Sequence, residues 1–259
     1  MFNMGLRKKQ GWFAGVTIWL ILILSFSAYA ETDNYGNADV HKKANYNDEY
    51  EKFLNQAYDT LLSVGTEEMR VEIPIVVKND DEVGAFARYV YQVYDLTGRV
   101  TVEKGVRSSA GENRIKIFLK LDNPYEIYNQ QKEVEQLIIN FVKGLEGVSD
   151  YDKVIQINNW IADGASYDYT LQHGSCYENL VGRVSTCNGF ASAFYTVCSY
   201  AGVHCENVKG WVGDKYHIWN RVELNGEWKY VDVTWNNMAG ENKWLLISRE
   251  EMNEDRVEE

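Results

Sequence analysis

The sequence predicts an α+β protein in which helices pack against antiparallel sheets. Of its 259 residues, 45% are hydrophobic and 25% are charged, which is the composition of a globular chain. Hydrophobic residues recur at intervals of three and four in several segments, as in helices that bury one face. Two alternating runs, 216–224 and 227–235, flank Asn225-Gly226, a pair typical of a tight β-hairpin. A chain of this length can bury one large core or two smaller ones.

Residues 1–30 differ from the rest of the chain. The basic start Arg7-Lys8-Lys9 precedes an uncharged stretch over 10–30, and Ala28-Tyr29-Ala30 has the small-x-small form of a cleavage site. This pattern predicts a signal peptide, with an uncleaved membrane anchor as the alternative, because about 20 apolar residues span a bilayer. Both predictions place the remainder outside the cytoplasm, either secreted or held at the cell surface. The polar residues 31–46 are typical of a linker.

The net charge argues against one class of function. The chain carries 26 Lys and Arg against 38 Asp and Glu, and beyond Ala30 the balance is 23 − 38 = −15. Because so large an acidic excess repels phosphate backbones, we expect no nucleic-acid partner. We expect contact with a membrane only through the N-terminal segment, where that segment is not cleaved.

Residues 47–148 are predicted to form a small α+β region. Helical spacing occurs around 50–62, 83–94 and 134–145, whereas alternating apolar residues predict strands at 71–77, 99–103 and 115–121. Pro74 cannot donate a ladder hydrogen bond, which favours an edge position for the first of these strands. Packing explains the apolar residues of this region, and none of its residues suggests chemistry.

The region 149–259 begins with a capping motif, Ser149-Asp150-Tyr151-Asp152, and contains a cysteine in an activating position. Ser185 or Thr186 can cap a helix with apolar residues at helical spacing over 190–201, which puts Cys187 in the first turn. Free amides and the positive end of the helix dipole favour a thiolate there. Taken alone, the residue fits a buried apolar cysteine about equally well.

The predicted hairpin brings a histidine and an aspartate together. A two-residue turn pairs Leu224 with Glu227, so His217 faces Thr234 and lies diagonal to Asp232, with Cα atoms about 7–8 Å apart. Asp232 can then accept a hydrogen bond from one ring nitrogen of His217 while the other nitrogen points at Cys187. Asn220 falls on the opposite face and is a poorer third member. That opposite face is predicted core, with Ile218, Val222, Leu224, Val231, Val233 and Trp235.

Three motifs in order carry a family resemblance: Thr-Cys-Asn-Gly-Phe-Ala at 186–191, His-Ile-Trp-Asn at 217–220 and Val-Asp-Val-Thr-Trp at 231–235. On these motifs, residues 149–250 resemble the transglutaminase-like superfamily, and most closely its exported bacterial members. The resemblance implies a papain-like fold, in which a nucleophile helix packs on an antiparallel sheet. It also implies that Cys187, His217 and Asp232 form a catalytic triad.

Further site residues are predicted around this triad. The backbone amide of Cys187 is one donor for an oxyanion hole, and the candidates for a second donor are Tyr167, Trp160 and Tyr177. Candidate cleft walls lie on the strand face of His217, and they are Trp219, Trp228 and Tyr230.

The resemblance implies a thiol enzyme that acts on amides of a peptide or protein substrate. Cys187 attacks the carbonyl, and the acyl-thioester is resolved by water, as in a peptidase or amidase, or by an amine, as in a cross-linking acyltransferase. The sequence leaves the acceptor open, and this chemistry requires no cofactor. The alternative is a non-catalytic cell-surface binding module with the same fold.

The other cysteines and the C-terminus have simpler interpretations. Cys198 and Cys205 are expected to be core residues or a mutual disulfide, and the pairing among them and Cys176 stays open. His173 and Cys176 form half of a zinc motif, but without the other half we expect no metal site. The acidic residues 250–259 are predicted to be a solvated end.

Overall fold

The computed structural model describes residues 69–77, 79–93, 97–105 and 115–259. The predicted signal peptide, the linker and the helix at 50–62 lie outside these residues. Within the described part of the chain, no helix is both long and apolar enough to span a lipid bilayer.

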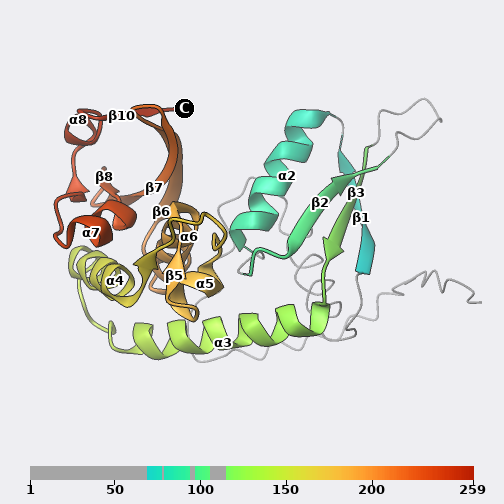
Figure 1. Cartoon of the computed structure of the whole chain (residues 1–259), viewed down its shortest axis with the longest axis horizontal. Coiled ribbons are helices and arrows are strands. Elements are labelled where there is room, and N and C mark those ends of the chain that lie inside the picture. Colours follow the sequence, from blue (N-terminus) through green and yellow to red (C-terminus); the bar gives the residue numbers. More distant parts are fainter. Residues whose placement is uncertain (1–68, 78, 94–96, 106–114) are drawn as a thin grey trace, which may run out of the picture. The chain divides into compact units, whose positions relative to one another are not determined.

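The first described part is a three-stranded antiparallel sheet with one helix (Figure 1). The strands β1 (Met69–Val77), β2 (Val100–Lys104) and β3 (Ile115–Leu121) lie in the order β1-β3-β2, and α2 (Asp80–Val93) contacts β1 and β2. Pro74 lies in an edge strand, as predicted, and the β1–β3 register shifts between Ile73 and Val77. Phe86 and Val90 bury the apolar face of α2.

A long helix, α3 (Pro124–Lys143), follows this sheet. Asn123 caps it by accepting from the amide of Glu126 at 3.3 Å, and Pro124 occupies the first turn, where its missing N–H costs nothing. The sequence pattern predicted only the half that begins at residue 134, because the apolar residues are densest there. Val134 and Ile138 are fully buried in the main core of the second half. The C-terminal part of α3 therefore packs against that half.

The second half combines five helices with an antiparallel sheet (Figure 1). The helices are α4 (Asp150–Gly164), α5 (Cys176–Leu180), α6 (Cys187–Tyr200), α7 (Val233–Ala239) and α8 (Arg249–Met252). The sheet has the order β10-β6-β7-β8-β9, with β6 (Cys205–Val212), β7 (Lys215–Leu224), β8 (Glu227–Val231), β9 (Leu245–Ile247) and β10 (Arg256–Glu258). A short parallel pair, β4 (Ser166–Tyr167) and β5 (Val184–Ser185), precedes α6.

The main core lies between α6 and the sheet. Phe190, Phe194 and Val197 of α6 are fully buried in one cluster with Val222 of β7 and Val231 of β8. Burying a side chain of this kind contributes about 1.5–3 kcal/mol of transfer free energy. This core fixes α6, and with it the position of Cys187, against the strands that carry His217.

The β7–β8 hairpin has the predicted register. Leu224 pairs with Glu227 and Asn220 with Val231, and both turn residues have positive φ, 53° at Asn225 and 81° at Gly226. The ladder ends at Asn220 and Val231, however, so the predicted pairing of His217 with Thr234 is wrong. The chain leaves the sheet after β8 and enters α7.

A helix cap causes this departure. Val233, Thr234 and Trp235 have strand propensity, but the Asp232 carboxylate accepts from the amide of Trp235 at 3.0 Å and begins α7. Val233 is buried in the core, as predicted. Trp235 is not on that face, since its ring contacts His217 and Trp244.

Candidate active site

Cys187 is the first residue of α6. Thr186 precedes it in extended conformation and makes no side-chain capping bond, and the first turn carries no acidic residue. The free amides of this turn and the helix dipole therefore favour negative charge at the Cys187 sulfur. The residue is partly exposed, so a substrate can reach it.

The other three cysteines are buried, and all four cysteines of the chain are free thiols. Burial raises the pKa of Cys176 to about 12. Burial, together with a hydrogen bond that its thiol donates to neighbouring Cys205, raises the pKa of Cys198 well above its ordinary value. The sequence offered two interpretations of Cys198 and Cys205. In the structure they are buried core residues and do not form a disulfide. Buried thiols of this kind are inert, which leaves Cys187 as the candidate nucleophile.

His217 lies against Asp232 through a direct hydrogen bond. The ring atom Nε2 is 2.8 Å from Oδ2 of Asp232, whose side chain is fully buried, and Oδ1 accepts from the Trp235 amide. Because Nε2 is occupied, Nδ1 is the nitrogen that remains available to Cys187. Burial alone would lower the pKa of His217, but hydrogen bonds to Asp232 and Cys187 outweigh it and raise the pKa to about 9. The structure therefore brings Cys187, His217 and Asp232 together.

Neutral amide side chains hold α7, and with it Asp232, against α4. Nδ2 of Asn236 donates to Oδ1 of Asn158 at 2.9 Å, and Oδ1 of Asn236 accepts from the amide of Trp244 at 2.8 Å. Asn237 donates to the carbonyl of Ala165 at 2.8 Å, at the end of α4. Sequence reasoning missed this network, although the pair Asn236-Asn237 directly after the aspartate motif was a visible signal.

Trp219 is buried and stacks on the ring of His217, so it does not line an open cleft. Its ring is stacked with His217 at 5.8 Å between centroids and 23° between planes, and it is only 1% exposed. Tyr230 is buried in the same small cluster. The third candidate wall, Trp228, contacts His204 and the guanidinium of Arg221.

The candidate oxyanion residues lie in different places. Burial, followed by the electrostatic interaction with Cys187, raises the pKa of the Tyr167 hydroxyl. Tyr167 therefore lies near Cys187. Trp160 is stacked on Phe141 of α3 at 4.1 Å, and Tyr177 makes a hydrogen bond with Glu133 of the same helix. Of these three side chains, only that of Tyr167 interacts electrostatically with Cys187.

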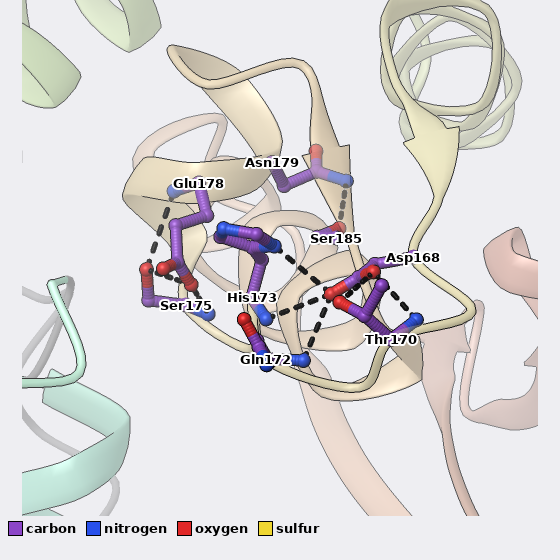
Figure 2. Close-up of polar contacts among 8 residues, drawn as sticks. All are labelled: Asp168, Thr170, Gln172, His173, Ser175, Glu178, Asn179 and Ser185. Carbon is purple, nitrogen blue, oxygen red and sulfur yellow. Dashed lines mark hydrogen bonds and ion pairs between the residues drawn. The ribbon is translucent and has the colours of Figure 1, made fainter.

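A tightly bonded loop between β4 and α5 lies beside the nucleophile, and Figure 2 shows its centre at Asp168. Oδ1 of Asp168 accepts from the amide and the hydroxyl of Thr170, at 2.8 and 2.6 Å. Oδ2 accepts from the amides of Gln172 and His173 and contacts Nδ1 of His173 at 2.9 Å. His173 is thus engaged with Asp168, and no group of side chains suited to a metal ion occurs among the residues that the structure describes.

The same loop is bonded to both neighbours of Cys187. The carbonyl of His173 accepts from the amide of Thr186 at 2.7 Å, and the carbonyl of Gly174 accepts from Nδ2 of Asn188 at 2.8 Å. The sequence alone assigned no role to Asp168. The signal that could have identified a local turn is Thr170, a hydroxyl residue two positions after this aspartate.

Replacing Asp168 with asparagine is expected to loosen this loop. In asparagine an NH2 group replaces one carboxylate oxygen, so the backbone N–H groups of Gln172 and His173 would lose their acceptor. These backbone amides should then exchange hydrogen faster. The bonds to Thr170 and His173 outweigh burial and hold the pKa of Asp168 far below its ordinary value. The carboxylate therefore stabilises the folded state above about pH 4, and this contribution is lost as the pH falls further.

Hydrogen exchange followed by mass spectrometry measures the effect, with Asp163→Asn on the exposed side of α4 as the matched control. Unchanged protection of residues 170–173 in Asp168→Asn would contradict this prediction.

The geometry defines a class of fold and site. A cysteine at the start of a buried helix meets a histidine from an antiparallel sheet and a carboxylate that directly follows the next strand, which is the papain-like arrangement. Residues 139–233 match the family model of the transglutaminase-like superfamily. This part of the chain is therefore similar to a transglutaminase-like domain.

Two curated relatives are the "Kyphoscoliosis peptidase" of Mus musculus and that of Homo sapiens. Each is 28% identical, over 139 and 136 residues, which is 47% and 46% of this chain. The matched segment is 21% and 20% of these relatives, so the chain spans about a fifth of their length.

Similar solved structures include the following two. A candidate cysteine protease from Cytophaga hutchinsonii is 14% identical, with a TM-score of 0.38 over 74% of this chain and 68% of that chain. A TGase is 16% identical, with a TM-score of 0.35 over 74% of this chain and 58% of that chain.

Proposed function

We propose that the protein is a thiol enzyme that acts on peptide or protein amides through an acyl-thioester at Cys187. The observation that carries the proposal is the position of His217, whose Nε2 lies 2.8 Å from Oδ2 of buried Asp232 and whose ring interacts with Cys187. A histidine raised to a pKa of about 9 is an imidazolium at neutral pH, and it stabilises the thiolate beside it.

In the first step, the Cys187 sulfur attacks the amide carbonyl carbon. The negative charge that develops on the carbonyl oxygen is stabilised by the backbone amide of Cys187, and the hydroxyl of Tyr167 is the nearest side-chain candidate for a second donor. His217 then gives its proton to the departing amine, and the C–N bond breaks. Asp232 keeps the ring oriented and stabilises its charge.

In the second step, the thioester is resolved by water or by an amine. The neutral His217 takes a proton from the attacking water or amine. The acyl group is transferred to that water or amine, and the sulfur of Cys187 is released. Water gives hydrolysis, as in a peptidase or amidase, and an amine gives a new amide bond. Both outcomes use the same three side chains, and the proposal covers both.

We further propose that residues 31–259 act outside the cytoplasm, on a substrate that is itself exported or on the cell surface. This part rests on the basic and apolar pattern of residues 1–30. Comparing the mass of the secreted or surface-held protein with that of the full chain tests it. Full-length protein found only in the cytoplasmic fraction would contradict it.

The experiment that tests the enzyme proposal is trapping of the acyl-thioester. Purified protein is incubated with activated peptide esters and glutamine-containing peptides, with and without a primary amine, and then digested for mass spectrometry. We expect an acyl adduct on the Cys187 peptide, and release of acid or of amide distinguishes water from amine. Saturable peptide binding without any adduct or product would instead identify a binding module.

A further inference from the structure

A buried arginine from the C-terminal strand contacts the carboxylate of the candidate triad. Nη2 of Arg256 donates to Oδ2 of Asp232 at 2.9 Å, and the same oxygen is 2.8 Å from Nε2 of His217. The side chains of Arg256 and Asp232 are both 0% exposed. Most of residues 250–259 are exposed, as predicted, but Arg256 is buried against the site.

The guanidinium is enclosed by aromatic rings. Its central carbon lies 4.9 Å from the ring centre of Trp235, 5.6 Å from Trp244 and 6.0 Å from Trp219. Nη1 bonds to Asp255, and Nε has no hydrogen-bond partner among the described residues. Cation–π contacts with these rings partly replace the lost hydration of the charge.

This arrangement is costly for a purely packing role. Removing a guanidinium from water carries a penalty of several kcal/mol that an ion pair often fails to recover. A neutral side chain of similar volume would fill the same space between the rings without that penalty. The charge itself therefore needs an explanation, and its partner is the carboxylate that orients His217.

The C-terminal strand is closely fitted to the sheet at this point. Glu258 of β10 pairs with Gly210 of β6, where an added Cβ would lie 2.1 Å from the carbonyl oxygen of Val257 and 2.8 Å from the Trp219 ring. Only glycine allows the strand and the ring to approach so closely. The amide of Glu259 also donates to the carbonyl of Lys209 at 3.0 Å.

We propose that Arg256 is a positioning residue of the thiol site. It fixes the Asp232 carboxylate and weakens the attraction of this carboxylate for the proton of His217. The inference deepens the proposed function and rests on it. Arg256 lies outside the segment 139–233 that matches the family model, so the C-terminal strand adds this element to the site.

The charged neighbours define the direction of the effect. His217 faces Cys187 and Asp232, Asp232 also faces Arg256, and Arg256 also faces Asp255. Without the Arg256 charge, Asp232 would interact with His217 alone and would hold the imidazolium proton more strongly. Without the Asp255 charge, Arg256 would compete more strongly for Asp232, and the proton would leave His217 more easily.

The test is an NMR titration of the His217 imidazole, with kcat and KM measured as functions of pH. In Arg256→Gln we expect the titration of His217 and the alkaline limb of kcat to move up by about one pH unit. We also expect kcat to fall about tenfold with little change in KM, because orientation and not substrate binding is lost. Arg256→Lys retains the charge and should keep the titration close to that of the wild type.

Arg249→Gln is the matched control, since Arg249 is exposed and contacts Glu258 at 3.4 Å instead of the triad. Asp255→Asn covers the case in which Arg256→Gln does not fold, and it should move the titration of His217 downward. An unchanged titration in folded Arg256→Gln, or in Asp255→Asn, would overturn the proposal.

The imidazole titration needs no turnover. If wild-type Cys187 forms no adduct while Arg256→Gln still shifts His217, the proposed function fails but the coupling stands. If adducts form and the titration does not move, only the role of Arg256 fails.

Discussion

Cys187→Ala is expected to lose turnover by about a thousandfold or more while folding as the wild type does. The loss is that large because removing a nucleophile leaves only binding and oxyanion stabilisation. The fold should be retained because Cys187 is partly exposed at the start of α6, and alanine is well tolerated in a helix. Product release from a peptide substrate, with a thermal melt on the same sample, measures both effects.

Cys176→Ala is the matched control for this result. Cys176 is fully buried, so the smaller side chain should lower the melting temperature and leave turnover in place. Near wild-type turnover in Cys187→Ala would mean that another group is the nucleophile.

His217→Gln is expected to slow alkylation of Cys187 by on the order of 100-fold at pH 6.5. With its pKa at about 9, His217 stays protonated at neutral pH and stabilises the thiolate. In the variant this stabilisation is lost, and a thiol without a cationic partner is only about 1% ionised two pH units below the free value of about 8.5. The rate of iodoacetamide labelling between pH 5 and 10, read at the Cys187 peptide, gives both profiles.

The same pKa fixes the sign of a stability effect. Because folding raises the pKa of His217, protonation stabilises the native state fully below about pH 6.5, and this contribution disappears as the pH rises through about 9. His217→Gln should therefore lose stability relative to the wild type chiefly at acidic and neutral pH. His204→Gln, on a histidine that contacts Glu223, serves as the control. Identical alkylation profiles in wild type and His217→Gln would exclude the catalytic pair.

Local sequence signals predicted the elements that carry the nucleophile and the histidine. Asn225-Gly226 imposed a two-residue turn, and the turn set the register of β7 against β8. A polar residue before an apolar helical stripe placed Cys187 at the start of α6. These features depend on neighbours in the chain, which is why a single sequence contains them.

The contact between His217 and Asp232 was predicted by an argument whose details are partly wrong. The sequence reasoning treated Asp232 as a strand residue diagonal to His217, whereas it caps α7 just after β8 ends. The strand propensity of Val233, Thr234 and Trp235 hid the cap, because a local propensity is easily outweighed by a side chain that satisfies a helix end. The two side chains meet in either geometry, since the chain turns only after Val231.

Arg256 and the loop around Asp168 could not be predicted in the same way. Arg256 reaches Asp232 across 24 residues of sequence, and its burial depends on three tryptophans, one in β7, one in α7 and one in the turn before β9. An acidic C-terminal segment resembles a solvated end by composition alone. Long-range packing of this kind leaves no periodic trace in the sequence.

The amide network that holds α7 has a consequence for how solution conditions act on the site. Asn158, Asn236 and Asn237 carry no charge and do not titrate, so ionic strength and pH leave their bonds to α4 and Trp244 in place. The contact between Asp232 and His217, in contrast, changes with the protonation state of the ring, although its burial shields it from dissolved salt. A reversible loss of activity with changing pH can thus be assigned to the charged groups, while the helix that carries the carboxylate keeps its position.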